Sequence, residues 1–87
     1  MSEFARESVE FQGVRVRVDG QEVTAGVELC IIPAGDRPTV WLTPTVVDGK
    51  QGIMVENLQP GQYRIWYRIT STPETVVDVV EETVTIT

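Results

Sequence analysis

Apolar and polar residues alternate with a period of two along most of the chain, which predicts β-strands rather than helices. The longest alternating segment covers residues 63–70, and shorter ones cover residues 14–18 and 27–31. An apolar run at residues 76–80 alternates less cleanly. We predict about seven short strands, at residues 14–18, 27–31, 39–42, 51–56, 63–70, 76–80 and 83–87, to which residues 45–47 would add a short edge strand.

Composition and turn signals agree with an all-β fold. Val, Ile and Thr account for 31 of the 87 residues, and β-branched side chains pack well on a pleated surface. The pairs Asp19-Gly20 and Asp48-Gly49 predict tight hairpin turns, because Asp and Gly tolerate the positive φ angles that such turns need. Residues 33–38 contain two prolines and a glycine, and are predicted to form a loop.

The segment from Leu58 to Tyr63 predicts a more specific feature of the fold. Pro60 and Gly61 turn the chain, and Leu58 is expected to fill the core beneath that turn. Tyr63 then opens the next strand with its hydroxyl within reach of backbone a few residues upstream. This is the tyrosine corner of immunoglobulin-like and fibronectin type III-like domains. We therefore predict a single antiparallel β-sandwich of that kind, in which the orientation of Trp41 stays open.

Charge narrows the range of partners. The formal net charge is -6 and the isoelectric point is about 4.4, so we expect no binding to the phosphate backbone of nucleic acid. No apolar run approaches the roughly 18 residues that span a bilayer, and we expect no membrane partner.

The chemistry of the side chains argues against catalysis. The chain has no His, a single Cys and a single Lys, so most nucleophile-plus-base pairs and zinc sites are excluded. Carboxylates at residues 74–82 lack the spacing of a calcium loop and are interpreted as solvated. Cys30 is expected to be a small buried apolar residue. We predict no catalytic residue, no metal site and no cofactor.

The outward face of the longest strand is the main candidate for partner binding. Arg64, Trp66 and Arg68 share that face, and Arg and Trp are enriched in interface hot spots. Arg15 and Arg17 would extend the patch if the first strand belonged to the same sheet. The alternative is an ordinary solvated face on which arginine stems cover the Trp ring.

Two further segments suggest contact with a neighbour. We assign residues 1–12 to an N-terminal arm and residues 13–87 to the sandwich. Phe4 and Phe11 are candidate anchors of the arm on a partner, although the arm would be equally ordered by packing on its own domain. The valine run at 76–80 is interpreted as core, as an edge strand, or as a strip that pairs with another subunit.

Several motifs carry a resemblance to a known family over residues 14–87. They are Val16–Gln21, Val27–Leu29 before a Pro-Gly loop, Leu58–Trp66 and the Thr-rich end Thr83–Thr87. With these motifs the chain resembles the small immunoglobulin-like structural proteins of tailed bacteriophages, particularly those that infect actinobacteria. The resemblance implies a virion protein that decorates the capsid or lines the head-tail region.

We therefore expect a non-enzymatic protein that binds the major capsid (coat) protein on the virion surface after synthesis in the host cytoplasm. A homo-oligomer is compatible with this role. Two alternatives stay open: a head-tail connector or tail-associated component, and a soluble module that binds carbohydrate or a cell surface. The absence of aromatic residues from the predicted loops counts against the carbohydrate-binding alternative.

Overall fold

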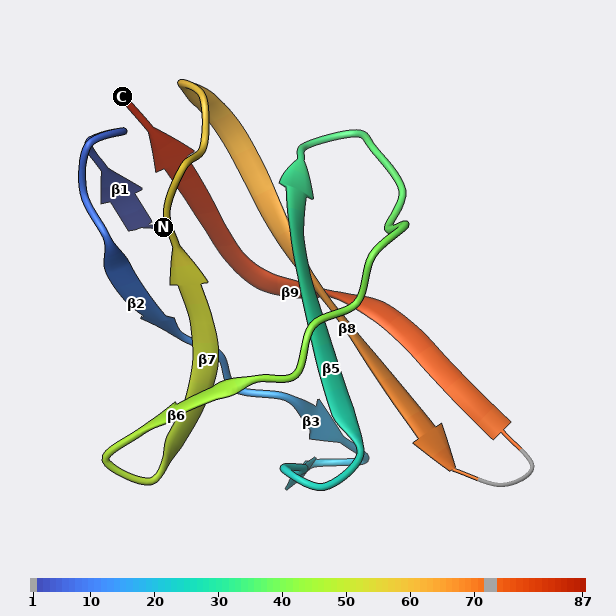
Figure 1. Ribbon diagram of the computed structural model, residues 1–87. Helices are drawn as coiled ribbons and strands as arrows, with labels where there is room; N and C mark the ends of the chain where they lie inside the picture. The colour runs from blue at the N-terminus through green and yellow to red at the C-terminus, as the bar shows by residue number, and fades with distance from the viewer. Residues whose placement is uncertain (1, 72–73) are drawn as a thin grey trace.

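The computed structural model describes residues 2–71 and 74–87, and these residues form β-strands and connections without a helix (Figure 1). The all-β fold class is therefore confirmed. The described strands are β1 (Ser2–Phe4), β2 (Glu10–Gly13), β3 (Arg17–Val18), β4 (Gln21–Glu22), β5 (Val27–Pro33), β6 (Thr45–Val47), β7 (Lys50–Val55), β8 (Gly61–Ser71) and β9 (Glu74–Ile86).

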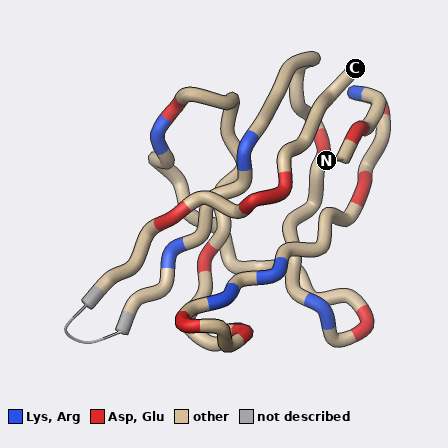
Figure 2. Tube along the Cα trace, turned by 180° about the vertical axis from the view of Figure 1, so that it is seen from behind, with Lys and Arg blue, Asp and Glu red and all other residues tan. Residues whose placement is uncertain are grey.

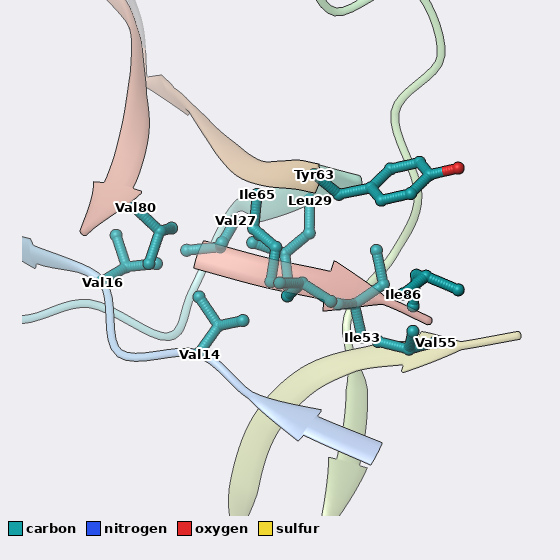
Figure 3. Close-up of a cluster of buried hydrophobic side chains, with 11 residues drawn as sticks. Val14, Val16, Val27, Leu29, Ile53, Val55, Tyr63, Ile65, Val80 and Ile86 are labelled. Atoms are coloured by element: carbon teal, nitrogen blue, oxygen red, sulfur yellow. The ribbon is translucent and has the colours of Figure 1, made fainter. Parts of the chain in front are cut away.

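Two sheets face each other across a common apolar core. One sheet has the order β1-β9-β8-β5 and the other has the order β2-β7-β6, while β3 and β4 form a small separate hairpin. Side chains from both sheets meet between the layers (Figure 3). Leu29 and Ile65 of the first sheet are completely buried, and Val55 of the second is 2% exposed. The other members of the core are Val14, Val16, Val27, Ile53, Tyr63, Val80, Val84 and Ile86.

The predicted turns are confirmed. Asp19 and Gly20 have φ angles of 52° and 78°, and Asp48 and Gly49 have φ angles of 51° and 77°. Positive φ at both central residues defines the type I′ turn, whose twist matches that of paired strands. These turns join β3 to β4 and β6 to β7, and they fix the register of both hairpins.

The tyrosine corner is also present. The Tyr63 hydroxyl donates a hydrogen bond of 2.7 Å to the backbone carbonyl of Gln59. The Tyr63 ring is 7% exposed, and Leu58 packs against the core beside it. The bond ties the start of β8 to the connection from β7, so this end of the molecule is held by a buried ring and a backbone acceptor.

Three strand predictions need correction. Residues 39–42 do not form a strand: only Leu42 pairs, through two backbone hydrogen bonds with Leu29, and the flanking Pro38 and Pro44 cannot donate to a ladder. Residues 14–16 lie between β2 and β3 rather than in a strand. The run at 76–80 and the terminal strand at 83–87 form one continuous strand, β9. The sequence also predicts a break in the strand pattern at Pro73, and this residue lies outside the described part of the chain.

The N-terminal segment is part of both sheets. β1 pairs with β9, in parallel, and β2 pairs with β7 in the opposite layer. The parallel pair differs from the fully antiparallel arrangement predicted. Residues 10–13 form one strand across the predicted boundary after residue 12, so that boundary does not separate an arm from a domain. Phe4 packs against the core, and the ring of Phe11 lies over Gly52 on β7.

Candidate partner-binding face

The face of the four-stranded sheet that points away from the core carries the predicted cluster. In the β5–β8 register Cys30 is opposite Trp66 and Glu28 is opposite Arg68. Leu29 and Ile65 occupy the core face of the same strands, and side chains alternate between faces along a strand. Arg64, Trp66 and Arg68 therefore share the outward face, as the sequence predicts.

Two residues from the connection between β5 and β6 complete this cluster. The Arg37 guanidinium carbon lies 5.1 Å from the centroid of the Trp66 ring. The Arg68 guanidinium carbon lies 4.9 Å from the centroid of the Trp41 ring. Both distances fall within the range of a cation–π interaction. We call the set Arg37, Trp41, Arg64, Trp66 and Arg68 the Arg–Trp face.

Arg68 is held by a second contact. Its Nε and Nη2 atoms both donate to Oε1 of Glu28, at 3.1 and 2.6 Å. The two side chains are about one-third exposed, so solvent screens the pair and its contribution to stability is modest. The contact instead orients the guanidinium beside Trp41, which lowers the entropy that a partner must remove on binding.

Arg64 lies at an irregularity in the sheet. The β8–β9 register shifts between Arg64 and Trp66, whose partners on β9 are Thr83 and Val79. The extra β9 residues form a bulge, and Arg64 Nη2 donates to the Val80 carbonyl within it at 2.8 Å. Arg64 Nε is buried and has no hydrogen-bond partner among the described residues.

Cys30 lies beneath this cluster and is 4% exposed. Burial raises the pKa of the thiol, and the backbone of Val40 and Thr39 offsets this only in part. The thiol is therefore protonated at neutral pH and packs as a small apolar group, as the sequence predicts.

The other candidate residues lie elsewhere. Arg15 is exposed on the segment that joins β2 to β3, and Arg17 is exposed in β3 itself, so neither residue belongs to the four-stranded sheet. Arg15 pairs with Glu22 at 3.4 Å. These two arginines do not extend the Arg–Trp face, and the predicted extension is wrong. Phe4 and Phe11 contact their own domain and are not part of the Arg–Trp face.

Sequence reasoning did not assign Arg37 or Trp41 to this face. The sequence predicts a strand at Trp41, whereas this residue lies in an irregular connection and is half-buried against Arg68. The loops of the molecule therefore do hold an aromatic residue, and the absence of loop aromatics cannot be held against carbohydrate binding. The available signal was the position of Trp41 between Pro38 and Pro44, which disfavours a regular strand.

Charged residues are spread over both layers (Figure 2). The Arg–Trp face holds three of the seven basic residues in a chain with a net charge of -6. Among the described residues no group of three or more Cys, Asp or Glu side chains is placed to hold a metal ion. The same residues include no helix long and apolar enough to cross a membrane. No protein family, curated protein or solved structure matches the chain.

Proposed function

We propose that the chain is an immunoglobulin-like sandwich. The order β5-β8-β9 in one sheet and β2-β7-β6 in the other corresponds to strands C, F, G and B, E, D of that fold. The tyrosine corner supports the same assignment, since Tyr63 stands at the start of the strand equivalent to F. The extra short strands described in the structure, β1, β3 and β4, lie at the margins of this arrangement.

We further propose that the protein is a non-enzymatic structural protein of a virion, which decorates the capsid by binding the coat-protein shell. The Arg–Trp face is the observation that carries the binding part of this proposal. Two aromatic rings and three guanidinium groups are gathered there by two separate segments of chain, β8 and the connection between β5 and β6. Tryptophan and arginine anchors in a preordered arrangement are typical of interface hot spots. The virion assignment rests on the family resemblance of the sequence motifs.

The local charge of the face defines the surface it fits. Arg37 and Arg64 have no ion pair among the described residues, and guanidinium groups bind carboxylates in a forked geometry. The complementary surface on the coat is therefore acidic around an apolar centre. The negative charge on the rest of the chain keeps the free protein dissolved and faces away from the shell.

Repetition supplies the strength of attachment. A single sheet face of this size forms an interface at the small end of the range for specific complexes. Subunits on a shell occupy many identical sites, and a protein that contacts two coat subunits at once gains from the high effective concentration of the second site. Each contact can then be weak while the decorated shell remains stable.

The test is co-sedimentation of the purified protein with coat-protein shells of the tailed phage that encodes it. We expect saturable uptake of hundreds of copies per shell. Trp66→Ala should weaken binding by about 2 kcal/mol, or about 30-fold in Kd, because it removes the central ring of the Arg–Trp face.

Phe11→Ala provides the matched control. It removes a half-buried aromatic ring from the outward side of the other sheet, and it should leave the affinity for shells unchanged. Circular dichroism establishes that both variants are folded. Binding by Trp66→Ala at wild-type affinity contradicts the proposed face, and no uptake by the wild type contradicts the virion role. Uptake of about a dozen copies indicates the head-tail region instead of the shell.

A further inference from the structure

The two sides of β9 differ in how far they are paired. On one side β9 follows β8 along most of its length, from Glu74 to Ile86. On the other side β1 pairs only with residues 84–86. Residues 75–82 have no strand beside them within the described part of the chain, and in Figure 1 this half of β9 forms a border of the molecule.

The backbone of this free edge points outward at alternate residues. The Thr70 amide donates to the Gly26 carbonyl on the β5 side of β8, so Ile69 must bond toward β9. Its partner Val76 bonds back to β8, and Thr75, Val77 and Val79 therefore present their N–H and C=O groups to the open side. In agreement, the Val79 amide donates to its neighbour's carboxylate, Asp78 Oδ1, at 2.7 Å.

The side chains along the edge are apolar and accessible. Val76 is 39% exposed and Val77 is 45% exposed. An open edge with exposed β-branched residues is a template for a further strand, and proteins usually block such edges with charge or proline. Within the described residues Thr75 to Val79, Asp78 is the only charged residue.

We propose that a second copy of the chain adds its own β9 to this edge, antiparallel and centred on Val77. In this register Val77 faces Val77 of the second copy, and Thr75 faces Val79 of the second copy. Both pairs lie on the outward face and join β-branched side chains, which is a favourable cross-strand combination. On the core side Val76 faces Asp78 of the second copy, so the two carboxylates are not opposite each other.

The structure favours this occupant and this register. The pairing is continuous with the established β1–β9 contact, and the free stretch has room for residues 74–80 of the second copy before β1 begins. Thr75, Val77 and Val79 present their backbone N–H and C=O groups to the open edge. A second β9 strand can therefore form hydrogen bonds only in a register that pairs odd-numbered residues with odd-numbered residues. The register one step along would place Asp78 opposite Asp78, and like charges directly opposite are destabilising.

The charges beside the edge also fit the dimer. A groove of about 560 Å³ runs between β9 and the segment before β3, and Arg15, Arg17, Asp78 and Glu81 are among its lining residues. The two arginines of each copy therefore lie near the carboxylates that the dimer brings together. This gives Arg15 and Arg17 a role that is separate from the Arg–Trp face.

The consequence is a bivalent molecule. The symmetry axis of such a pair is perpendicular to the sheet, so the sheets of the two copies become continuous. Both Arg–Trp faces then point to the same side, which allows one dimer to engage two sites on a repeating surface. The dimer does not depend on the proposed coat binding, since the edge and the face are different surfaces.

Disulfide trapping of single cysteine variants tests the register. In a hydrogen-bonded antiparallel pair the facing Cα atoms are about 5.5 Å apart, within the range of a disulfide. Val77→Cys should form a covalent dimer under mild oxidation, seen on a non-reducing gel. Thr75→Cys is the matched control on the same face of the same strand. In the proposed register its two copies are four residues out of step, roughly 13 Å apart along the strand, and it should stay monomeric.

The outcomes separate clearly. A Val77→Cys dimer without a Thr75→Cys dimer supports the proposal, provided that the wild type with buried Cys30 does not cross-link. Equal cross-linking of both variants, or of neither, overturns it. Sedimentation equilibrium gives a second measurement: Asp78→Ala should dimerise at lower concentration, because it frees the Val79 amide and removes a carboxylate from the edge. Weaker association of Asp78→Ala also overturns the proposal, and shell binding by the same samples reports separately on the function.

Discussion

The two halves of β9 have similar residues and opposite surroundings. In the second half, from Thr83 to Ile86, Val84 is completely buried and Ile86 is 4% exposed, with β8 on one side and β1 on the other. In the first half Val76 and Val77 are more than one-third exposed, and one edge has no neighbouring strand in the described residues. Both halves are rich in Val and Thr.

This difference shows what a β-branched sequence does and does not specify. Such residues favour an extended backbone wherever they occur. Whether they are buried depends on the opposite sheet, and here β2 and β7 cover only the end of β9 that pairs with β1. The first half of β9 keeps the same backbone conformation but extends beyond the cover, which leaves its edge available to a partner.

The largest expected change in the free energy of unfolding comes from truncating one aliphatic side chain to Ala in each half of β9. Ile86→Ala should lower the free energy of unfolding by about 2–5 kcal/mol, because it leaves a cavity between the sheets. Val76→Ala, on the same side of β9 as Ile86, should change it by less than about 0.5 kcal/mol, since Val76 is 39% exposed. Urea denaturation of the dilute monomer measures both, and similar losses for the two variants would remove the distinction between the halves.

A smaller loss of stability should follow from disturbing the pairing of β2 with β7, the two strands that cover the second half of β9. A Cβ on Gly52 would lie 2.7 Å from Cζ of Phe11 and would meet the carbonyl of Gln12. Gly52→Ala should therefore force β2 away from β7, at a cost of about 1–3 kcal/mol.

The matched variant is Gly13→Ala, on the facing strand, where a Cβ would lie 3.9 Å from the Phe11 ring in ordinary contact. Thermal unfolding compares the two. In hydrogen exchange, Gly52→Ala should raise the exchange rate of residues 84–86 and leave that of residues 75–79 unchanged. Equal stability of the two glycine variants would show that the close approach of Phe11 to Gly52 does not constrain the pairing of β2 with β7.

The smallest expected change in stability comes from removing a tyrosine hydroxyl on β8 opposite each half of β9. Tyr63 lies opposite Val84, and Tyr67 lies opposite Asp78. Tyr63→Phe should cost about 1 kcal/mol, because the carbonyl of Gln59 loses its hydrogen bond at the tyrosine corner. Tyr67→Phe, the same change on the same strand, should cost less than about 0.5 kcal/mol. Chemical denaturation of the two variants in parallel measures both losses of stability. A larger loss for Tyr67→Phe than for Tyr63→Phe would contradict the role assigned to the tyrosine corner.

Local patterns were sufficient to predict the class of fold and several of its details. Alternation placed Ile65 in the core and Trp66 outside it, and Asp-Gly pairs located two turns, because these features depend only on neighbours in sequence. The pairing of β1 with β9 could not be predicted in this way. It joins the two ends of the chain, and nothing in three residues such as Ser2–Phe4 specifies a partner more than 80 positions away.

The candidate site was predicted only in part, because some of its residues are neighbours in sequence and others are brought together by the fold. Arg64, Trp66 and Arg68 follow one another on a single strand, so alternation alone puts them together. Arg37 and Trp41 join them only because the connection after β5 folds back over that strand. Arg15 and Arg17 fit the alternation equally well but belong to the other layer, and sheet assignment is a property of the whole fold.

The most direct test of the proposed face is hydroxyl-radical footprinting of the protein bound to coat-protein shells. Trp41 and Trp66 are the only tryptophans, and both lie on the Arg–Trp face. Met54, on the outward side of β7 beside Phe11, serves as an internal reference on the other sheet. We predict that binding lowers oxidation of both tryptophans several-fold and leaves Met54 unchanged. Protection of Met54 with unchanged tryptophan oxidation would contradict the account, because the shell would then contact the opposite layer.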